Sequence, residues 1–377
     1  MELKFKKAIA IVASLSVTLI LASCSFGSSS SSSSKSSSYS TTGKAESGTY
    51  QGVIKNGKYQ VSKSRGVNVS QNDNLFNLKS FETGLLNVSK KVYSTKSYVF
   101  EEGQYLSTST IENWLSRKSS SNASGLNPVK GKTNGTRNPI YIQQIEEQDF
   151  MSQSGSSLKL HGITVGIGLN SIDYYQKTTD GPTYKQNISD SEMKDYGEKA
   201  AQTVLKRLRK KSALKDVPIT IALYKQAAND SLVGGTFFEY TSNSGSKISS
   251  WKQMNVKNKV YPKASSTSSS SDDQDDNDTF SNFKSQIQGF FPNLSGVTAQ
   301  AQYTDGSLSG MHITVTTQFY SQTEITSFTQ YIAQAANKYL QKGIPIDIKI
   351  QSATDLQAIA FRDSGDSKFT THVFDSY

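Results

Sequence analysis

The sequence predicts an α+β fold in which a helical N-terminal region precedes two related repeats, each with the order strand, strand, helix, strand, strand. The first observation is a match between HGITVGIGLN (161–170) and MHITVTTQFY (311–320), both of which alternate apolar with small or polar residues as half-buried strands do. The second is a match between VPITIAL (217–223) and IPIDIKI (344–350), in the proline and in the alternation. A helical apolar period lies between the two matching segments of each repeat.

The N-terminal region is predicted to contain two helices and one short strand before a loop. Six apolar residues recur at three- to four-residue intervals and so share one helix face: Leu75, Leu78, Phe81, Leu85, Val88 and Val92. Residues 98–100 are a strand candidate, and Thr110 is expected to cap a helix that carries Ile111, Trp114 and Leu115. Residues 119–139 are rich in Gly, Asn, Ser and Pro, which predicts a loop.

Each repeat is predicted to begin with a further strand, at 139–151 and 297–303, and to end with another, at 232–240 and 356–363. The two helices between them begin with the pattern S-x-x-E, at Ser189 with Glu192 and at Ser321 with Glu324. In such a capping box each side chain satisfies a free backbone amide. A helix that joins two strands covers one face of their sheet, so we expect mixed and antiparallel sheets with helices on a face.

Two segments interrupt this regular order. The insertion SIDYYQKTTDGPTYKQNI (171–188) separates strand from helix in the first repeat alone, and long loops at strand ends commonly carry function. Its aromatic residues Tyr174, Tyr175 and Tyr184 are candidate ligand contacts, with ordinary packing as the alternative. Residues 263–279 pass from a serine run into an aspartate run that lacks the EF-hand order, so we interpret them as a solvated linker.

The composition limits the chemistry that the chain can perform. It has 41 Lys and Arg against 31 Asp and Glu, with one Cys and three His. A single cysteine forms no intramolecular disulfide, and the histidines (His161, His312 and His372) are far apart in sequence. We therefore expect no metal site and no cofactor.

The first residues have the layout of a signal peptide. Lys4, Lys6 and Lys7 precede the uncharged run 8–20, which is short for a membrane span. Leu21, Ala22 and Ser23 then lead into Cys24, an order that resembles the lipobox of bacterial lipoproteins. By that resemblance cleavage falls between Ser23 and Cys24, and Cys24 carries the lipid. The alternatives are an uncleaved membrane anchor or a chance cysteine.

Long stretches of the remaining chain resemble the CamS family of sex-pheromone-precursor lipoproteins from Gram-positive bacteria. They include EEGQYLSTSTIENWL (101–115), GITVGIGLNSIDYY (162–175) and PITIALYKQAANDSLVGGTFF (218–238), together with 52–67 and 138–151. The resemblance implies a lipid-anchored protein on the extracytoplasmic face of the membrane. It also implies that the last residues before the cysteine are released as a short apolar conjugation pheromone. The corresponding segment is VTLILAS: Val17, Thr18, Leu19, Ile20, Leu21, Ala22 and Ser23.

These observations divide the chain into five parts. They are a signal peptide (1–23), a serine-rich tether (24–48), the N-terminal region with the first repeat (49–262), the linker (263–279) and the second repeat (280–377). The tether contains too few apolar side chains to offset the entropy of ordering it.

Few residues suggest catalysis. Gly166 and Gly168 lack the third glycine of a dinucleotide site, so we interpret them as strand glycines, and Gly234 and Gly235 as marks of a bulge or close packing. An envelope enzyme that acts on peptidoglycan or peptides is the alternative function, with carboxylates drawn from Glu101, Glu102, Glu146 and Glu147. Surface solvation is the simpler interpretation of these residues.

The cluster LKRLRKKSALK ends the helix of the first repeat. Its cations Lys206, Arg207, Arg209, Lys210 and Lys211 complement the helix macrodipole. The same residues are candidate contacts to anionic lipid or anionic envelope polymers, whereas export makes nucleic acid an unsuitable partner. We therefore expect a non-enzymatic lipoprotein whose ectodomain binds an unknown peptide, glycan or protein partner.

Overall fold

The computed structural model describes nine stretches of the chain. They are residues 38–43, 48–65, 67, 74–131, 137–155, 157–263, 271–290, 296–318 and 321–375. The predicted signal peptide, pheromone segment and Cys24 lie outside the described residues.

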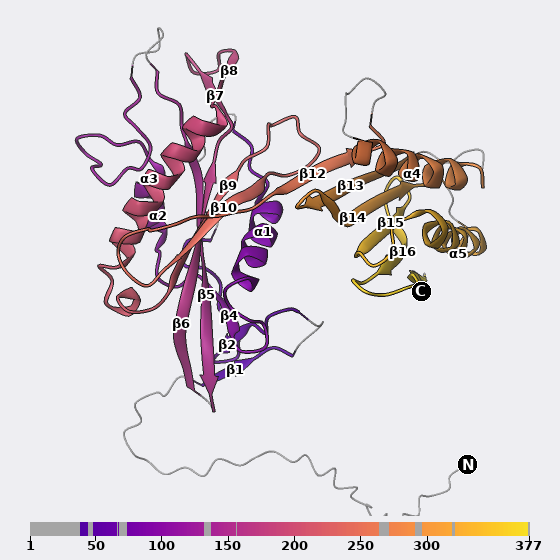
Figure 1. Ribbon diagram of the computed structural model, residues 1–377, viewed down its shortest axis with the longest axis horizontal. Helices are drawn as coiled ribbons and strands as arrows, with labels where there is room; N and C mark the ends of the chain where they lie inside the picture. The colour runs from indigo at the N-terminus through magenta and orange to yellow at the C-terminus, as the bar shows by residue number, and fades with distance from the viewer. Residues whose placement is uncertain are drawn as a thin grey trace, which may run out of the picture. The chain divides into compact units, whose positions relative to one another are not determined.

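The first repeat forms a six-stranded sheet (Figure 1). Across the sheet the strands follow the order β11 (Lys252–Gln253), β10 (Thr236–Asn243), β9 (Ile219–Lys225), β6 (Ser157–Leu169), β5 (Ile142–Ser154) and β4 (Val99–Glu102). Only β6 and β9 pair in parallel among these neighbours, since the helix α3 (Asp190–Leu208) carries the chain from one to the other. The predicted mixed sheet is confirmed.

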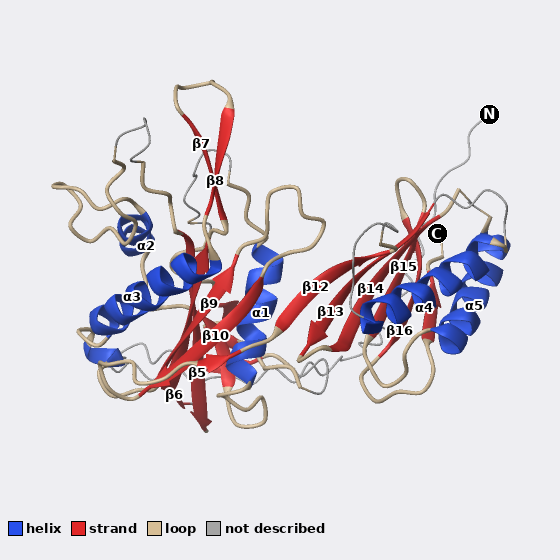
Figure 2. Cartoon of the chain, turned by 45° about the horizontal axis from the view of Figure 1, so that its top comes forward, coloured by secondary structure: helices blue, strands red, loops and turns tan. Residues whose placement is uncertain are grey.

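Helices cover both faces of this sheet. The helices α2 (Thr108–Leu115) and α3 pack on one face, where residues such as Trp114, Val165 and Val204 form the larger core. The helix α1 (Leu78–Lys90) packs on the other face through Phe81, Leu85 and Val88 (Figure 2). The short 3₁₀ helix η1 (Ser212–Leu214) follows α3.

The second repeat forms another six-stranded sheet. Its strands run β12 (Val256–Tyr261), β13 (Gly296–Thr304), β14 (Ser307–Thr316), β15 (Ile346–Gln351), β16 (Leu356–Arg362) and β17 (Thr370–Val373). The helices α4 (Ser271–Gln288) and α5 (Gln322–Tyr339) pack on one face of it (Figure 2). Again a single pair, β14 with β15, is parallel.

Backbone bonds identify equivalent positions in the two repeats. The amide of Ile163 in β6 donates to the carbonyl of Pro218, and the amide of Met311 in β14 donates to that of Pro345. These two prolines are the ones that matched in sequence. The predicted internal repeat is therefore present, although β6 and β14 align two residues away from their best sequence match.

Two boundaries differ from the sequence-based division. The strand β12 falls within 49–262 but pairs with β13, so it belongs to the second sheet. Residues 271–279 of the predicted linker begin α4 and are helical. Phe280, Phe283 and Ile287 lie three and four residues apart and are fully buried in the second core. Their burial draws this polar segment into a helix that its composition alone does not favour.

The helix caps agree only partly with expectation. The Ser189 hydroxyl accepts from the Glu192 amide at 3.2 Å, as the capping box predicts. Ser321 occupies the N-cap of α5 without a side-chain bond, and α2 is capped by Ser107 rather than by Thr110. The predicted Thr110 cap is wrong because the helix begins earlier, at Thr108.

Two small sheets complete the fold. One contains β1 (Tyr39–Thr41), β2 (Val53–Lys55) and β3 (Lys58–Tyr59). The other is a hairpin of β7 (Ile172–Gln176) and β8 (Thr183–Asn187), which the insertion of the first repeat forms.

Candidate functional site

The β7–β8 hairpin projects beyond one end of the first sheet (Figure 1). Its register places Tyr175 opposite Tyr184 and Tyr174 opposite Lys185. Because side chains alternate between the faces of a strand, the predicted contact residues lie on two different faces. Tyr175 and Tyr184 share one of them.

A buried ion pair fixes the base of the hairpin. Asp173 is fully buried, and its Oδ2 lies 2.5 Å from Nη1 of Arg137, which is itself almost buried. The same oxygen accepts from the amide of Ile140 at 3.0 Å, and Oδ1 accepts from Nδ2 of Asn74 at 3.3 Å. A buried carboxylate with several donors is held rigidly, because moving it would leave charge unpaired. The hairpin therefore stands on a fixed base.

An aromatic and cationic ladder follows from this base. The rings of Tyr175 and Tyr184 stack with centroids 5.7 Å apart. The guanidinium carbon of Arg137 lies 3.8 Å from the Tyr175 centroid, and Nζ of Lys177 lies 4.2 Å from the Tyr184 centroid. Tyr184 keeps 38% of its surface exposed, so it is the member that presents a ring to solvent.

Tyr174 makes its contacts within the fold. Its hydroxyl accepts from the amide of Asn229 at 3.2 Å, and its own amide donates to Oδ1 of Asn74 at 2.9 Å. These bonds join the hairpin to segments far away in sequence. Tyr174 therefore supports the hairpin, while Tyr175 and Tyr184 form its ladder.

Two members of the predicted basic cluster bind backbone carbonyls. Arg209 donates to the carbonyls of Leu214, Val217 and Asn243, each at 2.6 Å. Arg207 donates to that of Ser124 at 2.8 Å and lies over the Trp114 ring. These arginines hold the loops around the end of α3.

Two of the three lysines of the same cluster are more exposed to solvent than its arginines. Lys206 and Lys210 are exposed and Lys211 is half-buried. Only the lysines of the cluster therefore remain available for an anionic partner.

The predicted carboxylates divide between the two faces of β4 and β5. On the face that α2 covers, Oε2 of Glu147 accepts from the amides of Tyr105 (3.0 Å) and Leu106 (2.7 Å). Oδ2 of the neighbouring Asp149 accepts from the amide of Gln104 at 2.8 Å. Burial raises the pKa of both carboxyl groups, and the charge of Glu147 raises that of Asp149 further.

Glu101 pairs with Asp149 across the strands, and burial raises its pKa too. Glu147 and Asp149 converge, but they are 1% and 0% exposed and their oxygens accept from backbone amides of the loop that leads into α2. Glu147 is therefore not the solvated surface residue that the sequence suggests. The geometry of the two carboxylates is that of an internal support for α2.

Glu102 and Glu146 face the other way, toward α1. Burial raises the pKa of Glu146 to about 8, with a further rise from the charge of Glu82 and an opposing effect from a bond to Gln148. Oε2 of Glu102 accepts from the amide of Ser62 at 2.7 Å. The four carboxylates of the enzyme alternative therefore do not meet at one site.

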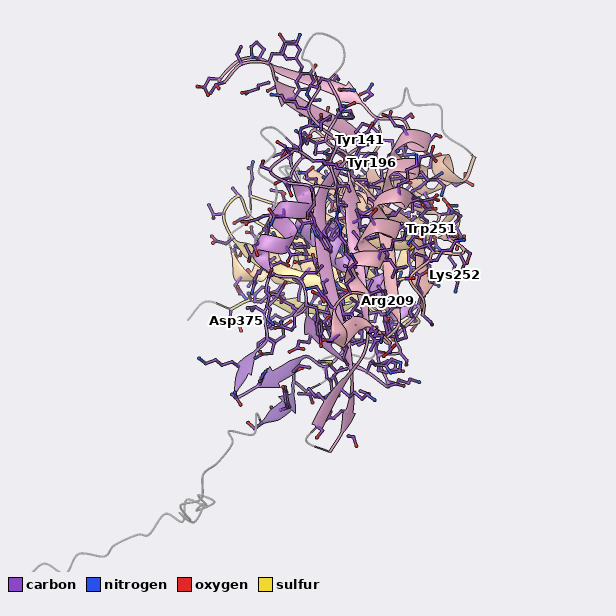
Figure 3. All side chains as sticks on the ribbon, turned by 90° about the vertical axis from the view of Figure 1, so that its left-hand side faces the viewer. Tyr141, Tyr196, Arg209, Trp251, Lys252 and Asp375 are labelled. Atoms are coloured by element: carbon purple, nitrogen blue, oxygen red, sulfur yellow. The ribbon has the colours of Figure 1, made fainter. Side chains whose placement is uncertain are left out.

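Sequence reasoning missed an aromatic pair beside α3. The rings of Tyr141 and Tyr196 stack at 3.9 Å, and Figure 3 shows them at one end of α3 with Arg209 at the other. The Tyr141 hydroxyl donates to Oε1 of Glu192 at 2.5 Å. The glutamate of the capping box therefore binds the side chain of the residue that immediately precedes β5. Burial, followed by this bond, raises the pKa of Tyr141. No local sequence pattern signals a contact over such a separation.

The histidines lie in separate surroundings. His161 stacks on Tyr98, with Nε2 2.7 Å from the tyrosine hydroxyl. His312 pairs with Asp347 on an exposed strand surface, at 2.9 Å. In the part of the chain that the structure describes, no group of three or more His, Cys, Asp or Glu is arranged to hold a metal ion, and no helix is long and apolar enough to cross a membrane.

Comparison with known proteins identifies the family. No curated protein matches the sequence. A crystal structure of the sex pheromone precursor from Lactobacillus salivarius subsp. salivarius is 52% identical, with a TM-score of 0.84, and covers 90% of this chain and 100% of that one. The C-terminal domain of the sex pheromone staph-cAM373 precursor from Staphylococcus aureus is 30% identical, with a TM-score of 0.68, and covers 79% of this chain and 96% of that one.

The family model described as CamS sex pheromone cAM373 precursor matches residues 59–368, which include the first repeat and the second as far as β16. Together with these two structures, this match shows that the chain belongs to the CamS family of sex pheromone precursors.

Proposed function

We propose that this protein is a lipid-anchored extracytoplasmic lipoprotein whose signal peptide releases VTLILAS as a conjugation pheromone. The observation that carries the proposal is the order of the N-terminal residues in a member of this family: three lysines, an uncharged apolar run, then Leu21, Ala22, Ser23 and Cys24. Acyl chains on Cys24 would hold the folded part at the membrane, since two or more chains give stable anchoring.

Replacing the cysteine tests the anchor. We expect Cys24→Ala to leave the signal peptide uncleaved or to release the protein from membranes, because no thiol remains to accept lipid. Ser28→Ala, a substitution in the adjacent serine tract, should leave both properties unchanged. Intact mass and partition into detergent measure the effect. A Cys24→Ala protein with the mass and partition of the parent would refute lipid anchoring.

A synthetic peptide tests the pheromone. We expect VTLILAS to induce clumping of a responsive plasmid-bearing strain, and a scrambled peptide of the same composition to have no effect. Inactivity of VTLILAS across responder strains, at concentrations that dissolve fully, would remove the pheromone role from the proposal while leaving the anchor in place.

For the ectodomain, we propose that the ladder of Tyr175 and Tyr184 binds a glycan chain of the cell envelope. An exposed ring offers an apolar face to a sugar ring, and Lys177 beside it adds a donor for hydroxyl or acidic groups. The buried Arg137–Asp173 pair supports this proposal, because a rigid base reduces the entropy that binding must overcome.

Cosedimentation with purified peptidoglycan sacculi tests the hairpin. We expect Tyr184→Ala to reduce the bound fraction about tenfold, as loss of a central aromatic contact does. Phe374→Ala is the matched control, because Phe374 is 40% exposed and lies after β17 of the second sheet. Equal binding by the parent and Tyr184→Ala would exclude the hairpin as the glycan contact.

A further inference from the structure

Lysines from three segments lie toward one end of the first sheet, where β6 begins and, six residues further along β6, β9 begins beside it. They lie at and after the end of α1, near the start of β6, and on both sides of η1 after α3. We name this surface the basic end, and it consists of Lys90, Lys91, Lys96, Lys159, Lys210, Lys211 and Lys215.

Two side chains bring these segments together. The hydroxyl of Tyr93, which follows α1, lies 3.2 Å from the carbonyl of Ile163 in β6 and 3.3 Å from that of Pro218. Tyr98 stacks on His161, with ring centroids 4.3 Å apart. In Figure 1, α1 ends beside the sheet, and β5 and β6 extend below it toward their hairpin. The lysines therefore belong to one end of the fold.

The basic end carries more positive than negative charge, although the half-buried Lys211 lies close enough to Glu147 to lower the pKa of that carboxyl group. In segments 86–98, 157–161 and 209–217 the single carboxylate is that of Asp216. Lys211 is half-buried and the other lysines of the basic end are exposed. None of them pairs with a carboxylate of the described residues. Charge that is exposed and unpaired is available to a partner of opposite sign.

The N-terminal segment of the described chain packs at this same end. The Tyr50 ring lies 5.1 Å from that of Phe150, and its hydroxyl donates to the carbonyl of Tyr93 at 2.5 Å. Just before it, β1 pairs with β2. Cys24 precedes Ser38 by fourteen positions, and a chain of that length reaches at most about 50 Å. An anchor at Cys24 would therefore keep this end near the membrane.

We infer that the basic end contacts an anionic lipid surface, the headgroups of the bilayer that holds the Cys24 lipid. This inference rests on the proposed lipid anchor. Lysines within about 10 Å of anionic headgroups are attracted at physiological salt, and the attraction decays over that distance. The contact would give the tethered ectodomain a preferred orientation, with the β7–β8 hairpin at the opposite end of the first sheet.

Vesicle binding by residues 25–377 tests the inference without the lipid. This chain keeps every residue that the structure describes, and its binding does not depend on acylation. We expect it to cosediment with vesicles of phosphatidylcholine mixed with phosphatidylglycerol, but not with phosphatidylcholine alone, and to dissociate at high salt. The Lys90→Gln, Lys91→Gln and Lys159→Gln triple variant should bind at least tenfold more weakly, since each lysine near the surface contributes roughly fivefold.

A triple variant elsewhere controls for total charge. Lys118→Gln, Lys130→Gln and Lys185→Gln remove three exposed lysines of the α2–β5 loop and the hairpin, and should leave vesicle binding unchanged. Equal loss in both triple variants would overturn the inference, as would binding to phosphatidylcholine alone. Binding to purified teichoic acid with none to anionic vesicles would also overturn it and assign the surface to a polymer. These outcomes are independent of the Cys24→Ala result, which tests the anchor.

Discussion

At equivalent positions of the two sheets, the first repeat buries carboxylates where the second buries alanines. Glu147 lies opposite Val165 and Asp149 opposite Ile163 in the first sheet. In the second, Ala299 lies opposite Ile313 and Ala301 opposite Met311. The carboxylates are matched by the backbone amides of residues 104–106, which lie just before the N-cap of α2. The strand position is thus the same, and the element packed above it decides what side chain it holds.

The opposite faces differ as well. Gly166 and Gly168 of β6 lie beneath α1, and a Cβ added at Gly166 would come within 2.7 Å of the Phe81 ring. The equivalent residues of β14, Thr314 and Thr316, are half-exposed. The glycines that resemble part of a nucleotide motif therefore allow a helix to approach the sheet closely. The two repeats therefore share their strand order, and the first repeat has additional features: buried carboxylates, a closely packed second helix layer, the hairpin and the basic end.

Substitutions at the equivalent positions Glu147 and Ala299 should change the free energy of unfolding the most. We expect Ala299→Glu to destabilise the protein by about 4 kcal/mol, because a carboxyl enters a core with no donors placed to bind it. Glu147→Ala should cost about 3 kcal/mol through the two amides it leaves unpaired, and Glu147→Gln less. Urea unfolding measures both changes. An unchanged free energy of unfolding for Ala299→Glu would mean that the second core tolerates polar groups, and the two sheets would then not differ in this respect.

The glycine contrast predicts a smaller effect. Gly166→Ala should cost about 3 kcal/mol, because the methyl group displaces Phe81 and Leu85 of α1. Thr314→Ala, at the equivalent position of the second sheet, should change the free energy of unfolding by less than about 0.5 kcal/mol. Comparable values for the two variants would show that α1 does not constrain β6.

The raised pKa of Glu146 predicts a pH dependence located in the first repeat. A carboxyl group with a folded pKa of about 8, well above its unfolded value, binds its proton more tightly in the folded state. The contribution of Glu146 to the free energy of unfolding is complete below about pH 4.5. As the pH rises through 8, the free energy of unfolding falls by on the order of 2 kcal/mol.

Hydrogen exchange at several pH values measures this effect strand by strand. Protection of β4 and β5 should fall between pH 5 and pH 8.5 more than that of β13 to β16, after correction for the intrinsic rate. Glu146→Gln should flatten the difference. A uniform change across both sheets would contradict the assignment to Glu146.

The helix caps give the smallest contrast. Ser189→Ala should cost about 1 kcal/mol, because the Glu192 amide loses its acceptor. Ser321→Ala at the matching cap of α5 should be nearly neutral, since its side chain makes no cap bond. Thermal unfolding of the two variants measures the difference, and equal shifts in Tm would mean that both serines cap their helices in solution.

Most helices and strands could be predicted, because their signals are local. The apolar period of residues 78–88 anticipates α1, and the alternation at 344–350 anticipates β15. The predictions failed where a distant partner decides the outcome. The acidic run 271–279 becomes helical through the burial of phenylalanines that follow it, and β12 joins the second sheet by pairing with β13. The sequence-based roles of Tyr175, Tyr184 and Cys24 remain predictions.

The repeated order of elements, the matching prolines and the family can all be recognised in the amino-acid sequence, because hydrophobic periodicity and motif order are local properties of the chain. Which polar groups are buried, and what they bind, depends on how distant segments pack in the folded protein. Glu147 needs amides some forty residues away, Arg209 needs carbonyls from the loop before β9 and from the end of β10, and the basic end unites lysines from three segments. Such contacts depend on packing distant segments together, and no local pattern encodes that packing.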